Sequence, residues 1–390
     1  MAGRRRGLVI AAALVIIVSV LTTASLAVAV IGNYQHLGRL VNVVRLVTSE
    51  YLEPTSFSTL VDGAMKGMVA SLKDPYSTYL EPDEYKQLFD QIQGSFSGIG
   101  VYVSKKDQNK IVVVSPIKGG PAERVGIKAG DVIVKVDGEE VANMDVDLAV
   151  SKIKGPEGSN VNLTVFREST KNFLEFAVPR EKVNIPVVTA ELAKGDNRIG
   201  VLRITQFNKT AAAEVDKAIR AFQDQHVKGI ILDLRDNPGG ELESAVDIAS
   251  NFVPQGPVVK VVNRNGETEV YQSTRNQVML PLAVLINGGS ASASEIVAGA
   301  IKDYGTGTMI GSKSFGKGIV QSVIPLDGGA AVKLTTAKYL TPKGNDIHKI
   351  GIEPDFKVEP EKNETPHVAG TEDNDTVFNK GVEVVRSMMR

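Results

Sequence analysis

Residues 281–321 decide the fold of this chain and carry its candidate chemistry; they read PLAVLINGGSASASEIVAGAIKDYGTGTMIGSKSFGKGIVQ. The apolar run at the start, bounded by Asn-Gly-Gly, predicts a buried strand, and apolar residues recur at helical spacing after Glu295. A strand, a turn of small residues and a helix in this order present a hydroxyl at a helix N-terminus. Free backbone N–H groups and the positive end of the helix dipole favour an oxyanion there. We therefore interpret the stretch as an active site.

Three serines lie within residues 290–294, and two explanations account for them. Serine is a favoured helix N-cap, and the stretch offers several capping registers. A serine nucleophile would also need a base, and none of the four histidines lies in a motif-like stretch. Lys317, which stands between two glycines at the start of an apolar run, is the alternative base. Scarce water there would favour its neutral amine, as a general base requires, although a lysine between glycines is also an ordinary surface turn residue.

The chain resembles the C-terminal processing (tail-specific) peptidases, which are S41-type serine proteases with a serine–lysine dyad and a PDZ domain. Three motifs carry the resemblance: residues 232–240 (LDLRDNPGG), 290–295 (SASASE) and 315–321 (FGKGIVQ). The resemblance covers nearly the whole chain. It implies that Ser292 is the nucleophile, that Lys317 is the base, and that Gln321 orients the lysine.

The resemblance also implies the fold: α/β, or α+β for the whole chain, with a ClpP/crotonase-like serine protease core. N-terminal helices, an inserted PDZ β-domain and a preceding transmembrane helix complete the expected architecture. The predicted boundaries are residues 1–32 for a membrane anchor or signal, 33–95 for the N-terminal helical region, 96–180 for the PDZ domain, 181–358 for the serine protease core and 359–390 for a polar linker with a C-terminal helix.

Strands and helices alternate in the predicted protease core, which favours a largely parallel sheet with sites at the strand ends. We expect strands at residues 199–204 and 229–234 and helices at residues 211–225 and 242–252. Residues 236–240 reach the face that carries Ser292 if the strands before the two segments are parallel neighbours. The candidate oxyanion donors are then the backbone N–H groups of Gly239, Gly240 and Ala293. Which glycine donates is not decided by the sequence.

Short strands separated by turns are predicted between residues 96 and 180. We expect strands at residues 98–103, 110–114, 131–136 and 160–166, and a helix at residues 146–153. Residues 120–131 (GPAERVGIKAGD), followed by Asp137-Gly138, are similar to a PDZ domain. This resemblance implies a loop whose N–H groups bind the C-terminal carboxylate of a peptide that adds as a strand, formed by Ser97, Gly98, Ile99 and Gly100. A simple tight turn is the alternative explanation for these glycines.

An uncharged run of 24 residues, 8–31, follows three arginines at positions 4–6. It is long enough to cross a bilayer, which needs about 20 apolar residues, and is longer than the core of an ordinary signal peptide. The arginines should stay in the cytoplasm, so we predict a single-pass protein of the bacterial cell membrane with an extracytoplasmic catalytic part. Residues 24–27 (ASLA) are an alternative cleavage site, which would release a secreted enzyme.

Composition excludes several classes of function. A formal net charge of −1 over 390 residues gives no electrostatic reason to expect nucleic acid as a partner. The chain has no cysteine, which excludes a disulfide framework, a thiolate metal site and a cysteine nucleophile. No ligand cluster or phosphate loop stands out, so neither a cofactor nor a metal is expected.

These features together predict a serine endopeptidase that cleaves peptide bonds in the C-terminal region of extracytoplasmic proteins. Its PDZ domain is expected to recognise protein or peptide substrates by a free, apolar C-terminus. The N-terminal helices are expected to pack on the core or on a second subunit, which would make a homo-oligomer. Two alternatives remain: a catalytically inactive PDZ-containing binding protein on a protease fold, and an esterase or acyltransferase that shares the nucleophile.

Overall fold

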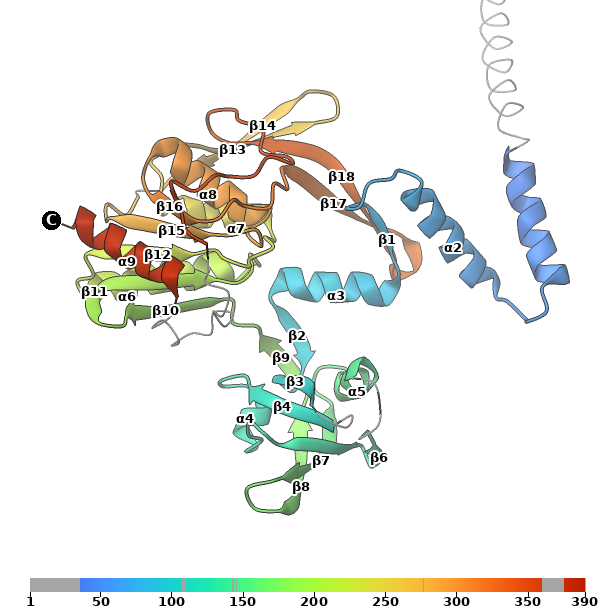
Figure 1. Cartoon of the computed structure of the whole chain (residues 1–390). Helices are drawn as coiled ribbons and strands as arrows, with labels where there is room; N and C mark the ends of the chain where they lie inside the picture. Colours follow the sequence, from blue (N-terminus) through green and yellow to red (C-terminus); the bar gives the residue numbers. More distant parts are fainter. Residues whose placement is uncertain are drawn as a thin grey trace, which may run out of the picture. The chain divides into compact units, whose positions relative to one another are not determined.

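A computed structural model of the chain describes residues 36–106, 110–141, 144, 146–275, 277–359 and 375–389 (Figure 1). The run predicted to cross a membrane, residues 8–31, lies outside these ranges, as do residues 360–374 of the predicted linker. Within the described ranges, no helix is both long and apolar enough to span a bilayer. The chain divides into two compact units, residues 1–79 and residues 80–390.

The first unit is mainly helical where the structure describes it. Residues 36–50 form one helix and α2 (Phe57–Ala70) forms a second, and both lie in the helical region predicted for residues 33–95. The hydroxyl of Ser56 accepts the N–H of Thr59 at 3.1 Å, which caps α2 by satisfying a donor that the helix itself leaves unpaired. No residue of α2 is buried. β1 (Thr78–Leu80) spans the division between the units.

The second unit begins with α3 (Pro82–Gln93), whose first residue is a proline, a residue that is tolerated in the first turn because its missing N–H would be unpaired there anyway. Next comes a β domain whose sheet has the strand order β3-β4-β5-β7-β8, with β6 paired to β5. Its elements are β3 (Val101–Lys106), β4 (Lys110–Pro116), α4 (Pro121–Arg124), β5 (Val132–Val136), β6 (Glu139–Glu140), α5 (Val146–Ile153), β7 (Asn160–Arg167) and β8 (Asn172–Pro179). Alternate residues point inward, so that Ile111 and Val113 of β4 are buried in an apolar core of this domain.

The strand predicted at residues 98–103 is interrupted in the structure. β2 (Ser95–Gly98) ends at Gly98, where it pairs antiparallel with β9 (Glu181–Asn184), and β3 starts only at Val101. Gly100 lies between them with φ +73°, a left-handed conformation that leaves a strand and that glycine adopts without strain. The chain therefore turns at Ile99 and Gly100 as it enters the β domain.

The central sheet of the core predicted at residues 181–358 has the strand order β10-β11-β12-β15-β16-β19, and every neighbouring pair is parallel except β10 with β11. Its strands are β10 (Val188–Ala193), β11 (Asp196–Ile204), β12 (Gly229–Asp233), β15 (Leu282–Ile286), β16 (Thr308–Gly311) and β19 (Phe356–Lys357). β12 and β15 are direct neighbours, with Asp233 opposite Leu285. The predicted condition that brings residues 236–240 to the face of Ser292 is thus met.

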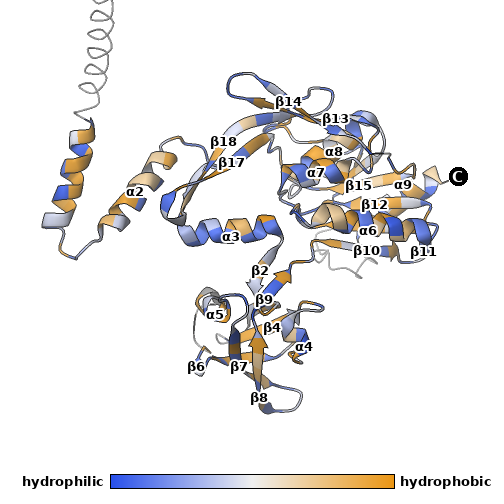
Figure 2. Ribbon diagram, turned by 180° about the vertical axis from the view of Figure 1, so that it is seen from behind, coloured by the Kyte–Doolittle hydropathy of each residue, from blue (hydrophilic) through white to orange (hydrophobic). Residues whose placement is uncertain are grey.

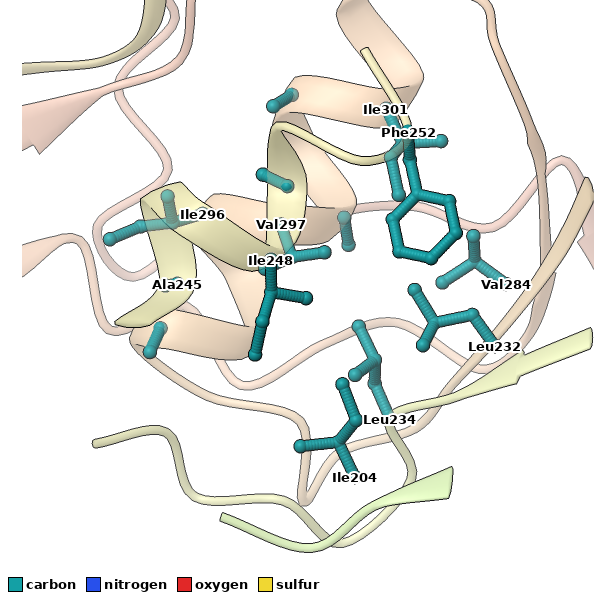
Figure 3. Packing of buried hydrophobic residues seen from close by; sticks show 14 of the residues in the cluster. Ile204, Leu232, Leu234, Ala245, Ile248, Phe252, Val284, Ile296, Val297 and Ile301 are labelled. Atoms are coloured by element: carbon teal, nitrogen blue, oxygen red, sulfur yellow. The ribbon is translucent and has the colours of Figure 1, made fainter. Parts of the chain in front are cut away.

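Helices cover both faces of this sheet. β12 and β15 are buried along their whole length, and both are largely in the hydrophobic colour in Figure 2. Leu232 and Val284 belong to the core on one face (Figure 3). That face is packed by α6 (Ala211–Asp224), α7 (Leu242–Ala249) and α8 (Ala293–Tyr304). Ile231 belongs to the core on the other face, together with residues of α9 (Thr376–Met388).

The spacing of apolar residues along α6 explains which of its side chains are buried. Val215, Ile219 and Phe222 of α6 fall on one stripe and are buried, and each such side chain contributes about 1.5–3 kcal/mol relative to exposure.

α7 ends at Ala249 although the pattern predicts a helix to residue 252. Pro254 follows closely, and a proline disfavours helical conformation in the residue before it.

A second, antiparallel sheet in the core includes the strand order β14-β13-β18, with β17 paired to β18. Its strands are β13 (Gly256–Asn263), β14 (Thr268–Ser273), β17 (Ile319–Pro325) and β18 (Ala331–Leu340). β17 starts two residues after Lys317 and pairs with β18 along its length. The second sheet thereby positions the segment that carries the candidate base.

The C-terminal helix α9 acquires a structural role that its sequence does not reveal. Its N-cap residue, Asp375, accepts the N–H of Phe378 at 2.9 Å and pairs with buried Arg235 at 2.8 Å. Arg235 also binds Asp233 at 2.8 Å; burial alone would lower the pKa of Arg235, but the two carboxylates outweigh it and raise the pKa. The pairs connect α9 to the residue that precedes the 236–240 loop.

Candidate active site

Ser292 lies in the turn between β15 and α8, at the N-cap of the helix. Its backbone has φ +54° and ψ −114°, a conformation that costs free energy for a residue with a Cβ and persists only where neighbours enforce it. The Ser292 carbonyl accepts the N–H of Glu295 at 2.8 Å and the hydroxyl of Tyr339 at 3.0 Å. Burial and the Glu295 carboxylate raise the pKa of Tyr339 well above its ordinary value, so this hydroxyl stays a donor.

The two flanking serines have different roles from Ser292. Ser290 and Ser294 are both completely buried. The Ser290 hydroxyl donates to the Leu234 carbonyl at 2.8 Å, and the Ser294 hydroxyl donates to the Asn237 carbonyl at 2.9 Å. Both therefore bind the turn to the loop after β12. Of the three serines, Ser292 alone lines the cavity described below.

Lys317 and Gln321 are joined by a hydrogen bond from the lysine Nζ to the glutamine Oε1 at 3.0 Å. Gly316 and Gly318, which flank Lys317, allow the backbone of its loop to pack closely against a neighbouring segment. A Cβ on Gly318 would lie 2.7 Å from the His348 nitrogen, and Gly316 has φ +86°. The loop before β17 can therefore lie against the 348–351 segment only with glycine on both sides of Lys317.

One cavity of about 730 Å³ contains all six residues predicted for the catalytic centre. They are Ser292, Lys317, Gln321, Gly239, Gly240 and Ala293. Its other walls include apolar side chains from helix and strand, among them Leu242, Ile296, Ile319, Val320 and Val323. The volume and the mostly apolar walls are typical of a ligand site with a few convergent polar groups.

The two glycines of the 236–240 loop differ in their hydrogen bonding. The Gly239 N–H donates to the Asn237 side-chain oxygen at 2.9 Å. The N–H groups of Gly240 and Ala293 meet no acceptor among the residues that the structure describes. A Cβ on Gly239 would lie 2.8 Å from the Ala293 nitrogen, so the loop packs directly on the start of α8. Gly240 and Ala293 are thus the pair of predicted donors that remains available to a ligand oxygen.

Of the four residues predicted to bind a peptide tail, three line one cavity and the fourth does not. Gly98, Ile99 and Gly100 line a second cavity, of about 360 Å³, whose other walls come partly from β3 and α5. Ser97 is absent from that lining; its hydroxyl donates to the Gly155 carbonyl at 2.9 Å. The Ile99 side chain is buried in the core of the β domain.

Glu295 and Tyr339 have no predicted role, although both form hydrogen bonds with the backbone of Ser292. Glu295 has a local signal, because Ser-x-x-Glu before an apolar run is a capping box. Tyr339 has none, because its contact with Ser292 crosses 47 residues of sequence. The described ranges hold no group of three or more His, Asp or Glu side chains placed to bind a metal ion.

Three protein-family models match three separate parts of the chain. The model of peptidase family S41 matches residues 198–358, that of a PDZ domain matches residues 112–167, and that of the N-terminal domain of the activating protease CtpB matches residues 21–84. The carboxy-terminal processing protease CtpA of Bacillus subtilis (strain 168) is 37% identical, over 96% of this chain and 83% of its own length.

CtpB of the same Bacillus subtilis strain, also a carboxy-terminal processing protease, is 40% identical over 80% of this chain and 66% of its own length. Among solved structures, the photosystem II D1 C-terminal processing protease aligns with a TM-score of 0.50 and 31% identity. That alignment covers 90% of this chain and 96% of the other.

Proposed function

This chain belongs to the carboxy-terminal processing proteases of peptidase family S41, as its motifs predict, and we propose from this that Ser292 and Lys317 form its catalytic dyad. The chain is a serine-type peptidase with a PDZ domain. We propose further that it cleaves peptide bonds in the C-terminal region of its protein substrates.

One observation carries the proposal for the dyad. Ser292, the hydrogen-bonded pair Lys317–Gln321, and the two N–H groups that meet no acceptor in the described part of the chain line the same cavity. A nucleophile, a base with an orienting partner and an oxyanion hole are what acyl transfer requires.

In this mechanism the neutral amine of Lys317 takes the proton of the Ser292 hydroxyl while Oγ attacks the carbonyl carbon of the scissile peptide. The N–H groups of Gly240 and Ala293 donate to the oxygen that becomes negative, and loss of one such donor typically raises the barrier by about 2.7–4 kcal/mol. The Lys317 ammonium then protonates the leaving amine, which leaves an acyl ester on Ser292. Water, deprotonated by the same lysine, hydrolyses the ester. Gln321 keeps the amine oriented by accepting one of its hydrogens throughout.

Peptide cleavage by the full-length chain tests this function directly. The enzyme is mixed with a panel of proteins with apolar C-termini, and the products are mapped by mass spectrometry. We expect cuts that cluster near the C-termini and that are missing when Ser292→Ala replaces the wild type. Release of only ester-linked groups would favour the esterase or acyltransferase, and stable complexes without any product would favour the inactive binding protein.

We propose that the β domain recognises the C-terminus of the substrate through Gly98, Ile99 and Gly100. Three features support this: the cavity that these residues line, its walls from β3 and α5, and the apolar side chains Val101, Val150 and Ile153 among them. A peptide that adds as a strand gains main-chain hydrogen bonds at any sequence, but only a chain end offers a carboxylate to consecutive N–H groups.

Amidation of the substrate's C-terminus should therefore lower kcat/KM. Hydrogen bonds to a charged group contribute about 1.5–3 kcal/mol, so the decrease should be roughly tenfold or more for a peptide whose cut site is unchanged. The measurement compares free and amidated forms of one peptide. A variant that lacks residues 96–180 serves as the control and should not distinguish the two forms. Equal cleavage of both forms by the intact enzyme would remove the carboxylate from recognition.

We propose that residues 8–31 anchor the enzyme in the bacterial cell membrane with the catalytic part outside the cytoplasm. The uncharged run behind three arginines supports this orientation. The full-length chain should fractionate with membranes and resist carbonate extraction, whereas a chain that begins at Gly32 should stay in the soluble fraction. A mature N-terminus near residue 28 would show instead that a signal peptide is removed.

A further inference from the structure

Glu295, in the first turn of α8, is a completely buried carboxylate. It is the acceptor of four hydrogen bonds. Its Oε1 accepts the Ser314 hydroxyl at 2.6 Å and the Gly316 N–H at 2.7 Å. Its Oε2 accepts the Lys317 N–H at 2.8 Å and the Ser292 N–H at 2.9 Å.

The two bonds to Oε2 connect the proposed nucleophile and the proposed base. Ser292 and Lys317 are 25 residues apart (317 − 292) in two different loops, yet their backbone N–H groups share one acceptor atom. A shared acceptor limits how far the two backbones can separate. The serine–lysine chemistry itself assigns no proton transfer to Glu295.

We propose that Glu295 is a positioning residue that holds the nucleophile and the base in register. The inference rests on the proposed dyad, because it concerns the same two residues. It assigns to the carboxylate a role in turnover beyond helix capping.

The chemistry of the contact requires a carboxylate. An ionised carboxylate is an acceptor only, with about four lone-pair positions, so it can satisfy four donors at once. Its buried charge is stabilised by these donors and by the N-terminal end of the α8 dipole. A glutamine has nearly the same shape but only one oxygen. Its NH₂ group would therefore face the donors that one of the two carboxylate oxygens now accepts.

The backbone of Ser292 gives a second reason for this role. Its strained conformation must be enforced by neighbours, and the Glu295 side chain holds its N–H while the Tyr339 hydroxyl holds its carbonyl. Loss of the carboxylate removes the acceptor of the Ser292 N–H and also the acceptor of the Gly316 and Lys317 N–H groups.

The two most informative variants are Glu295→Ala and Glu295→Gln. The alanine variant loses all four contacts, and a displacement near 1 Å costs on the order of 10²-fold, so kcat should fall by about that factor with KM little changed. In the glutamine variant, the remaining oxygen can keep Ser292 and Lys317 together while the NH₂ faces the Ser314 hydroxyl, which can accept. Its kcat should therefore lie between those of the alanine variant and the wild type.

A buried carboxylate elsewhere in the core supplies the matched control. Asp196 accepts hydrogen bonds from Arg198 and Arg386, both at 2.8 Å, at the start of β11. Asp196→Asn should lower the denaturation midpoint and leave kcat unchanged, so it separates lost stability from lost positioning. All kinetic constants are referred to the folded fraction, measured by denaturation under the assay conditions.

The outcomes are distinguishable. If the wild type cleaves and Ser292→Ala does not, the dyad's nucleophile is established, and the Glu295 variants then test positioning alone. Wild-type kcat in folded Glu295→Ala or Glu295→Gln would overturn the inference and leave Glu295 as a helix cap. A tenfold rise in KM with unchanged kcat would also overturn it, because uniform substrate binding would then be the property lost. Failure of the wild type to cleave any peptide would refute the proposed function instead.

Discussion

Replacement of Lys317 by arginine should abolish peptide cleavage, and Ser292→Ala should do the same, with kcat lower by on the order of 10⁶-fold in either variant. The arginine variant keeps the positive charge but cannot act as a base, because a guanidinium does not lose its proton in the working range. The double variant Ser292→Ala/Lys317→Ala should lose no more than either single change, since nucleophile and base act as a unit. Single-turnover and steady-state cleavage of one peptide provide the measurement.

Lys313 provides a matched control in the same loop. Its ammonium binds Glu353 at 2.7 Å and its side chain is half exposed, so Lys313→Arg should keep wild-type turnover. All variants should unfold at denaturant concentrations near that of the wild type. Near-normal turnover by Lys317→Arg would show that the base lies elsewhere, and the mechanism proposed above would be wrong.

Replacement of Gly240 by alanine should reduce both turnover and stability. Gly240 has φ +148°, and a Cβ there would overlap the carbonyl oxygen of Phe207, which is backbone and cannot move aside. The Gly240 N–H would then shift from its position in the wall of the cavity that Ser292 also lines. The lost oxyanion donor alone should lower kcat by roughly 10²–10³-fold, with a lower denaturation midpoint in addition.

Gly288 separates the general effect of an added methyl group from the effect at the oxyanion hole. A Cβ on Gly288 would meet nothing within 4 Å, although this residue lies in the turn that precedes the serines. Gly288→Ala should therefore keep both turnover and stability. If folded Gly240→Ala retained wild-type kcat, another group would have to stabilise the oxyanion.

Local sequence patterns predict the elements around the site because each pattern is short and self-contained. The apolar runs before residues 236 and 288 predict two buried strands, and their small-residue turns place both loops at strand ends. The structure pairs these strands in parallel as β12 and β15. The β13–β14 hairpin, which our prediction omits, also has a local signal: Asn265-Gly266, with φ +83° at Gly266, is a typical hairpin turn.

Other features depend on contacts that no local pattern specifies. Gly239 and Gly240 are indistinguishable in sequence, and their hydrogen bonding differs only because the Asn237 side chain accepts the Gly239 N–H. Asp375 reaches Arg235 across 140 residues, so the sequence identifies α9 as a helix without revealing what it holds. The four donors to Glu295 come from two loops that are distant in sequence and meet only in the folded core.

Because the backbone of Ser292 is strained in the folded protein itself, the free-energy cost of this strain is incurred during folding and not when a substrate binds. Its φ of +54° is established as the chain folds and is maintained by Glu295 and Tyr339 before any peptide arrives. If the backbone of a nucleophile reached its strained conformation only when substrate bound, part of each substrate's binding energy would be used for that distortion. Here a short peptide with few contacts and a long protein with many meet the same prepared hydroxyl. If Ser292 is the nucleophile, as proposed, the length of a substrate should affect how firmly it is held more than the geometry of attack.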